Sequence, residues 1–378
     1  MPTFSFPTLI HFGPGVRGQV GPHLKGQGVR RPLVVTDKGL AALPLPRELM
    51  DGLRAASLEP ALFSDVAGNP VDTQVRAGVE AYRAHRSDSI VGLGGGAALD
   101  VAKAVALMAT HPGTLFEYED GRKDARPIDK DVPYWVALPT TAGTGSEVGR
   151  SAVISDEKHI KKIIFSPRLL ARAVFADPEL TLALPAKVTA ATGMDALTHC
   201  IEAYLAKDYH PICDGIALEG LRLAARALPR CVESPQDIQA RSDMMMASMM
   251  GAIAFQKGLG LVHSCAHALS TVADLHHGFA NGVMIDRALA FNLQTSADKF
   301  ARMAQVVGLE EQTGAALLGW LRALKARIGI PENLRAAGVD RAELDRLSAL
   351  AFQDTCHLNN PRPCTQADFR RIYAEAFA

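Results

Sequence analysis

The sequence predicts an α/β domain with a Rossmann-like parallel sheet, followed by an all-helical domain. Its 378 residues suggest two domains, at about 100–200 residues per domain. In the first half, short apolar runs alternate with helix-length stretches, which is typical of a parallel sheet covered on both faces. From about Pro185 onward, the chain is rich in Ala, Leu and Met with helical periodicity. We therefore expect an α/β domain over residues 1–184 and a helical domain over residues 185–378.

Four short apolar runs end in polar or glycine-rich turns and are the expected strands. They are Arg31–Asp37, Ser89–Leu93, Trp135–Pro139 and Ala173–Pro178. Helix-length stretches lie between them, at Val71–Arg86 and Leu99–Thr110. In the second half, helical periodicity is clearest at Ala190–Leu205, Asp214–Leu228, Arg241–Phe255 and Ala315–Arg327.

The composition excludes several classes of protein. Forty Lys and Arg balance forty Asp and Glu, so no net field draws the chain to nucleic acid or to an acidic membrane. Apolar residues make up 48%, enough for packed cores, and no apolar run approaches the ~18 residues of a membrane helix. The N-terminus lacks a secretion signal, and six cysteines without a CxxC pair indicate reduced thiols. We expect a cytoplasmic enzyme without a nucleic-acid or membrane partner.

A glycine-rich turn suggests phosphate binding. Gly94, Gly95 and Gly96 directly follow an expected strand and precede a helix that carries Asp100 and Lys103. Glycines at such a place let backbone N–H groups approach a phosphate, and the helix N-terminus adds a favourable dipole.

The order of the cofactor fingerprint is unusual. The segment Gly92-x-Gly94-x-x-Ala97 matches G-x-G-x-x-G/A, whose acidic ribose ligand normally follows about 20 residues later. Here the best acid, Asp37, precedes the glycines. Either the glycines form only a tight strand–helix turn, or the chain has an unusual nucleotide fold. In that fold Asp37 would accept from an adenosine ribose hydroxyl and favour NAD over NADP; its alternative is a turn-forming Asp before Lys38.

A second loop of small residues follows the third expected strand, at Thr140–Glu147. Its hydroxyl groups and adaptable backbone suit contacts with adenine, phosphate or ribose. A helix-capping turn would explain the same residues equally well.

Histidines in the helical half point to a metal. Asp195 and His199 are four residues apart, which places both on one face of a helix, and His263 and His267 repeat this spacing. A histidine pair, His276 and His277, follows. A carboxylate and several imidazoles from separate helices are ligands for Fe²⁺ or Zn²⁺. The alternatives are surface pairs or hydrogen-bonded core histidines, but burying so many polar rings without a partner would cost several kcal/mol.

Four segments and one short run near the end carry a family resemblance. The segments are Gly94-Gly95-Gly96-x-x-x-Asp100-x-x-Lys103, Pro139–Glu147, Gly193-Met194-Asp195-Ala196-x-x-His199-x-x-Glu202, and Gly258-Leu259-Gly260-x-Val262-His263-x-x-x-His267 with His277-Gly278-x-x-Asn281. The short run is Asn360-Pro361-Arg362. Together they resemble the iron-dependent (group III) alcohol dehydrogenase family over essentially the whole chain. The resemblance implies its dehydroquinate synthase-like fold and explains why the acid precedes the glycines.

The resemblance also implies the roles of individual residues. It makes Asp195, His199, His263 and His277 the metal ligands, and it places His267 beside the nicotinamide, as part of the proton path. It implies that Fe²⁺ or Zn²⁺ binds together with NAD(H). The implied cofactor-binding residues are Asp37, Gly94, Gly95, Gly96, Asp100, Thr140, Thr141, Thr144, Ser146 and Lys162.

The expected reaction is hydride transfer between a primary alcohol and nicotinamide. The bound metal would act as a Lewis acid on the alcohol, and the reverse reaction would reduce an aldehyde. A metal-dependent hydrolase or lyase on the same scaffold is the alternative. Similar proteins pair through an N-terminal strand, so Phe4–Phe12 suggests a homodimer.

Phe255 and Lys257, which precede His263 and His267 in the sequence, are candidate substrate contacts. Phe255 is a candidate wall of the substrate pocket, and Lys257 would bring a cation within reach of an acidic tail. The surrounding run is similar to family members that act on 4-hydroxybutyrate, so we expect the substrate to be an ω-hydroxy acid. The alternative for Lys257 is that its side chain points to solvent and does not contact the substrate. The sequence departs from the family pattern at Ala268-Leu269-Ser270 and at Met284–Arg287, beside the expected ligands.

Overall fold

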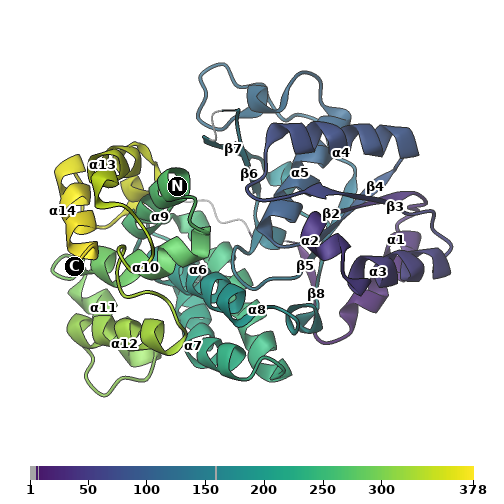
Figure 1. The fold of residues 1–378 in the computed structure, drawn as a ribbon. Helices are drawn as coiled ribbons and strands as arrows, with labels where there is room; N and C mark the ends of the chain where they lie inside the picture. Colours follow the sequence, from purple (N-terminus) through teal and green to yellow (C-terminus); the bar gives the residue numbers. More distant parts are fainter. Residues whose placement is uncertain (1–5, 7, 158–159) are drawn as a thin grey trace. The chain divides into compact units, whose positions relative to one another are not determined.

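The computed structural model describes residues 6, 8–157 and 160–378, and these form two compact units (Figure 1). The first is an α/β unit made of Phe6–Thr141 and Ser146–Thr181. The second is helical and made of Leu182–Ala378 together with the short segment Ala142–Gly145. The expected succession of an α/β part and a helical part is confirmed.

A six-stranded sheet, parallel throughout, forms the centre of the α/β unit. It contains the four expected strands, and β1 and β3 extend it at its two edges. Of the expected N-terminal strand Phe4–Phe12, the last four residues form β1, and residues 4, 5 and 7 lie outside the described part. In spatial order the strands are β1 (Leu9–Phe12), β8 (Ala173–Ala176), β5 (Tyr134–Pro139), β4 (Ser89–Gly94), β2 (Pro32–Asp37) and β3 (Ala61–Val66).

Helices cover both faces of this sheet, which is why its central strands are buried along their whole length. Leucines of α1 and α3 pack with Val91 and Val136 on one face. On the other face, Leu99 and Ala102 of α5 lie over Gly92. The helices are α1 (Val20–Gly26), α2 (Lys38–Ala41), α3 (Pro44–Ala55), α4 (Asp72–His85) and α5 (Gly96–Thr110).

The strand order reverses between β2 and β4. From β2 the chain adds β3 on one side and then crosses to add β4 on the other. In open α/β sheets, ligands bind at the carboxyl ends of the strands at such a reversal. Asp37 ends β2 and Gly94 ends β4, so the two predicted cofactor residues lie at this point.

An antiparallel hairpin of β6 (Ser151–Ser155) and β7 (Lys161–Phe165) also belongs to the α/β unit. The sequence analysis did not predict it. Its strands have five residues each, which gives too few alternations for a clear strand pattern.

The helical unit is built around α6 (Ala186–Leu205), whose residues from Thr189 to Ala203 are all buried. It packs against α7, α8 and α10, and the four expected helices all form. The other helices of the unit are α7 (Pro211–Glu233), α8 (Ile238–Ala254), α9 (Leu261–Ala273), α10 (His277–Ala290), α11 (Ala297–Val306), α12 (Gly314–Arg327), α13 (Leu344–Gln353) and α14 (Gln366–Ala376).

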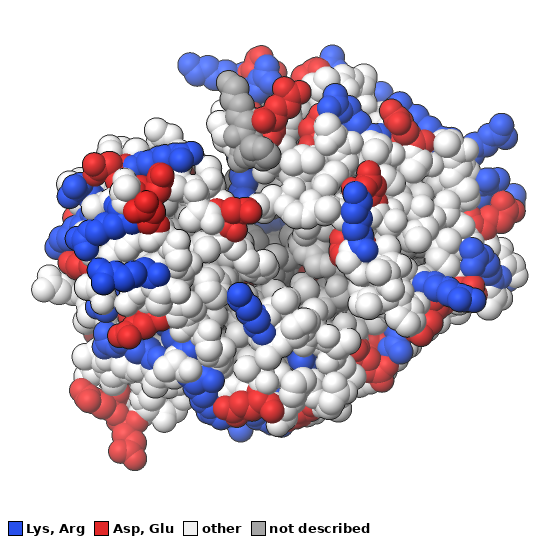
Figure 2. All heavy atoms as spheres, viewed as in Figure 1, with Lys and Arg blue, Asp and Glu red and all other residues white. Residues whose placement is uncertain are grey.

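The surface and the helix lengths agree with the composition. Figure 2 shows basic and acidic side chains interspersed over the face in view, as equal numbers of the two predict. Among the described residues, no single helix is long and apolar enough to cross a membrane. One bent pair, Ile238–Lys257 with Leu261–Ala273, would pass by length and composition alone.

Candidate active site

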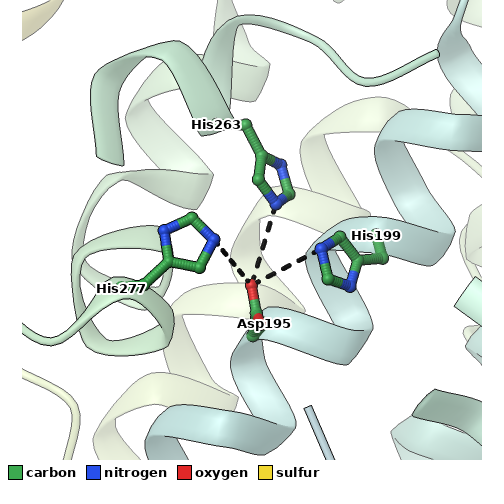
Figure 3. A group of neighbouring side chains, drawn as sticks. All are labelled: Asp195, His199, His263 and His277. Carbon is green, nitrogen blue, oxygen red and sulfur yellow. Dashed lines mark ion pairs between the residues drawn. The ribbon is translucent and has the colours of Figure 1, made fainter. Parts of the chain in front are cut away.

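Three helices of the helical unit bring the four predicted metal ligands together (Figure 3). Asp195 and His199 lie one turn apart on α6, His263 lies in the first turn of α9, and His277 begins α10. The Oδ1 atom of Asp195 lies 3.7 Å from Nε2 of His199, 3.7 Å from Nε2 of His263 and 3.3 Å from Nε2 of His277. One ligand atom from each residue falls within 4.8 Å of all the others.

This donor set fits a divalent cation. Burial lowers the pKa of His199 to about 4, so its imidazole is neutral and offers a lone pair. Burial alone would raise the pKa of Asp195, but His199 and His277 outweigh it and hold that pKa well below its usual value. Burial would likewise lower the pKa of His263, yet hydrogen bonds with Asp195 and Glu202 raise it to about 9. The site therefore stabilises positive charge, and one carboxylate with three imidazoles suits Fe²⁺ or Zn²⁺.

Glu202 orients His263, a role that the sequence analysis did not assign. Its Oε2 lies 2.6 Å from Nδ1 of His263, which leaves Nε2 to face Asp195. The same carboxylate accepts from the backbone N–H groups of Gly260 (3.1 Å), Val262 (2.6 Å) and His263 (3.2 Å). A partner on the second ring nitrogen fixes the tautomer of a metal-binding histidine. The sequence signal that could have indicated Glu202 was its spacing, because it follows His199 by three residues and so lies on the same helix face.

Asn281 is a second residue that supports the metal ligands and to which the sequence analysis assigned no role. It lies one turn after His277 on α10, and its Nδ2 donates to Oδ1 of Asp195 at 2.8 Å. The same Nδ2 lies 3.4 Å from Nε2 of His263 and 3.3 Å from Nε2 of His277. The amide thus holds the carboxylate of Asp195 toward the imidazoles.

His267 lies beside this cluster and is held by a carboxylate from a distant part of the chain. Its ring centre is 5.1 Å from that of His277, and its Nδ1 lies 2.7 Å from Oδ2 of Asp354, directly after α13. Ser264 (2.7 Å) and the backbone N–H of Cys356 (2.8 Å) donate to the other oxygen of Asp354. Burial would raise the pKa of Asp354, but His267 and these donors hold it well below its usual value. Nothing in the local sequence could identify Asp354, because 87 residues separate it from His267.

At the reversal point of the sheet, the glycine turn and Asp37 lie side by side. One oxygen of Asp37 caps α2 by accepting from the Leu40 N–H at 2.8 Å, as the turn interpretation predicts. The other oxygen faces Gly94, where a Cβ would lie 3.3 Å from it and 2.7 Å from the Cβ of Ala98. Gly94 also has a φ of 149°, which only glycine adopts readily.

The N-terminus of α5 lies in the glycine turn. The helix begins at Gly96, and no side chain caps it at Gly95. Thr141 lines this turn, since its Oγ1 would lie 3.3 Å from a Cβ at Gly95, and the Thr140 N–H donates to the Gly94 carbonyl at 3.0 Å. Unpaired N–H groups at a helix N-terminus attract anions.

Asp100 and Ser146 form a buried polar network within the α/β unit. Oδ1 of Asp100 accepts from the Ser146 hydroxyl at 2.6 Å, and Oδ2 accepts from the Val153 N–H at 3.0 Å. The Lys103 ammonium donates to Ser146 and to the Ser151 carbonyl, both at 2.7 Å. This network joins α5 to β6, and contacts of Asp100 and Ser146 with a cofactor stay a prediction.

Two other predicted cofactor residues have different surroundings. Lys162 lies on β7, where its ammonium pairs with Glu119 at 3.0 Å. Thr144 is partly exposed and lies in Ala142–Gly145, the loop segment that belongs to the helical unit. A Cβ on Gly143 would lie 2.7 Å from Cβ of Thr192 on α6, so the loop sits directly against that helix.

Phe255 lies at the metal ligands, whereas Lys257 is engaged elsewhere. The ring of Phe255 lies 5.0 Å from that of His199. Lys257 is buried, and its ammonium binds the carboxylate of Asp214 and, at 3.1 Å, the carbonyl of Tyr204. The solvent-exposed alternative is therefore wrong. The prediction that Lys257 offers a free cation to an acidic substrate also needs correction, because its ammonium is already bound to Asp214.

Comparison with known proteins defines the class. Residues 7–178 match the iron-containing alcohol dehydrogenase family, and residues 189–377 match the C-terminal part of the Fe-containing alcohol dehydrogenase family. The chain belongs to this family of oxidoreductases, and nothing in the comparisons supports the hydrolase or lyase alternative.

Individual relatives cover almost the whole chain. It is 40% identical to 4-hydroxybutyrate dehydrogenase of Cupriavidus necator over 98% of both chains. It is 37% identical to NAD-dependent methanol dehydrogenase of Bacillus methanolicus over 100% of both. The crystal structure of a 1,3-propanediol oxidoreductase superposes with a TM-score of 0.94 at 36% identity, covering 100% of each chain.

Proposed function

We propose that this protein is a metal-dependent NAD(H) alcohol dehydrogenase that interconverts short primary alcohols and aldehydes. The observation that carries the proposal is the convergence of Asp195, His199, His263 and His277 within one helical unit. A divalent cation held there, Fe²⁺ or Zn²⁺, would supply Lewis-acid polarisation of the substrate oxygen.

The chain's own residues orient the ligands and move the proton. Glu202 holds the Nδ1–H of His263, so that Nε2 of this ring presents its lone pair to the cation site. Asp354 accepts from Nδ1 of His267, which leaves Nε2 of that ring free to take a proton from the alcohol side. With a reference pKa near neutrality, a histidine suits this transfer.

The dinucleotide binds at the reversal point of the sheet. The open N-terminus of α5 and the glycine turn would receive the pyrophosphate, with Thr140 and Thr141 beside them. The free oxygen of Asp37 would accept from a ribose hydroxyl and repel a 2′-phosphate, which favours NAD over NADP. The name of the Bacillus methanolicus relative supports the same choice.

For the substrate we propose an ω-hydroxy acid such as 4-hydroxybutyrate, with Phe255 as an apolar wall beside the metal ligands. The support is the Cupriavidus necator relative and the 5.0 Å approach of Phe255 to His199. The buried Lys257 is not part of this proposal. We further propose a cytoplasmic homodimer that pairs through the exposed edge of β1, where Leu9 and Phe12 face outward.

The test is NADH consumption with a panel of aldehydes and semialdehydes of increasing chain length, after loading with Fe²⁺ or Zn²⁺. We expect turnover that is highest with the four-carbon semialdehyde and lost in Asp195→Asn, a variant of nearly the same size. Consumption of NADH with none of these carbonyls, by a protein that has taken up the metal, would contradict the proposal.

A further inference from the structure

A second group of metal-binding atoms lies beside the proton path. His267 on α9, Asp354 after α13 and Cys356 each offer one ligand atom within 4.8 Å of the other two. Each of the three residues keeps part of its surface exposed to solvent. We propose that this cluster, called here the sulfur site, binds a thiophilic divalent cation such as Zn²⁺, Cd²⁺ or Co²⁺ and thereby blocks catalysis.

The geometry of the sulfur site is held in place by the fold. Helices α9 and α13 pack against each other, and the 3₁₀ turn Cys356–Asn359 packs on α9. Ser264 ties the turn to α9, because its hydroxyl donates to Asp354 and accepts from the His357 N–H at 3.0 Å. The three donor residues are therefore positioned before a cation arrives.

The donor set selects the cation. Nitrogen, carboxylate oxygen and sulfur together suit Zn²⁺ and softer ions and exclude Mg²⁺ and Ca²⁺, which require oxygen ligands. Burial and the neighbouring Asp354 raise the pKa of the Cys356 thiol, so the thiol keeps its proton until a cation displaces it. Binding would release that one proton to solvent, while the imidazole proton of His267 moves from Nδ1 to Nε2.

Occupation of the sulfur site would stop proton transfer. Once a cation holds Nδ1 of His267, Nε2 carries the remaining proton and cannot accept another. This consequence rests on the proposed function of His267, whereas binding of the cation does not. An excess of Zn²⁺ is therefore expected to inhibit an enzyme that one equivalent activates.

Cobalt distinguishes the two sites, because only the sulfur site contains a thiol. The metal-free full-length protein would be titrated with Co²⁺ while absorbance and bound metal are measured. We expect the second equivalent to produce a sulfur-to-cobalt charge-transfer band in the near ultraviolet. In Cys356→Ser this band should vanish, and affinity for the second ion should fall at least about 100-fold, since even outer-sphere partners contribute about 10–100-fold.

Cys213→Ser is the matched control, because Cys213 also lies beside an imidazole, with its Sγ 3.4 Å from Nε2 of His210. A band that survives in Cys356→Ser, or disappears in Cys213→Ser instead, would overturn the proposal, as would binding of a single equivalent by the wild type. A band that depends on Cys356 without inhibition by excess Zn²⁺ would refute the blocking role and count against His267 as the proton path. Metal content and thermal unfolding of each variant show whether it is folded.

Discussion

Replacing Glu202 by Gln tests how the metal ligands are positioned. The substitution keeps the size of the side chain but exchanges one carboxylate oxygen for an NH₂ group. Four buried N–H groups now donate to the carboxylate, three from the backbone and one from the ring of His263. In either orientation of the new amide, at least one of these donors would face another donor.

The expected loss of stability follows from the number of N–H groups that donate to Glu202. Each buried donor without an acceptor costs about 1–3 kcal/mol, and bonds to a neutral amide are weaker than bonds to a carboxylate. We expect Glu202→Gln to lower the free energy of unfolding of the metal-free protein by about 2–4 kcal/mol. The affinity for a divalent cation should fall about 10–100-fold, because His263 would lose its fixed tautomer.

Urea unfolding measures the first effect, and competition with a chelator measures the second. Glu219→Gln is the control, because this carboxylate pairs with Arg222 on the exposed face of α7 and should contribute less than about 1 kcal/mol. If Glu202→Gln unfolded at the wild-type urea concentration and bound the cation with wild-type affinity, the argument that Glu202 orients His263 would be refuted.

Three further results are expected. Gly94→Ala should weaken NADH binding, measured by fluorescence titration, because the new methyl group would meet Ala98 at 2.7 Å in a backbone conformation with positive φ; unchanged affinity would exclude a tight glycine turn at the cofactor. Burial raises the pKa of Glu147 to about 7, so the folded protein holds this proton more tightly than the unfolded chain does, and its contribution to stability falls as the pH rises from 4.5 to 7. The free energy of unfolding of Glu147→Gln minus that of the wild type should therefore be about 2–3 kcal/mol more favourable at pH 8 than at pH 5. Urea unfolding at both pH values measures this difference, and a difference that does not vary with pH would contradict the reasoning. Lys257→Ala should lower the free energy of unfolding by about 1–3 kcal/mol, since Asp214 would lose its partner, yet leave the ratio of kcat/KM for ω-hydroxy acids to that for butanol within about twofold; a large change in this ratio would restore Lys257 as a substrate contact.

The sequence predicted the fold because its signals are local. Continuous apolar runs such as Ser89–Leu93 indicate buried parallel strands, and the spacing of Asp195 and His199 places both on one helix face. The meeting of His263 and His277 with that pair could not come from spacing. It came from the family resemblance, and the packing of α10 on α6 and of α9 on α10 now provides its physical basis.

The partners of the supporting residues could not be predicted because they are distant in the chain. The spacing places Glu202 on the same helix face as His199, but His263 lies 61 residues away, and no pattern connects it to Glu202. For the same reason Lys257 was misinterpreted: its partner Asp214 is 43 residues away and becomes visible only when α7 folds beside the turn that carries the lysine. A charged residue in an apolar segment indicates an interaction, but the sequence does not show with which group.

The bond between Glu202 and the first turn of α9 has a consequence for how the protein acquires its metal. Because Glu202 accepts from the N–H groups of Val262 and His263, bonds within the protein hold the backbone that carries His263. Removal of the cation should therefore leave this turn folded, and reloading should not require it to refold.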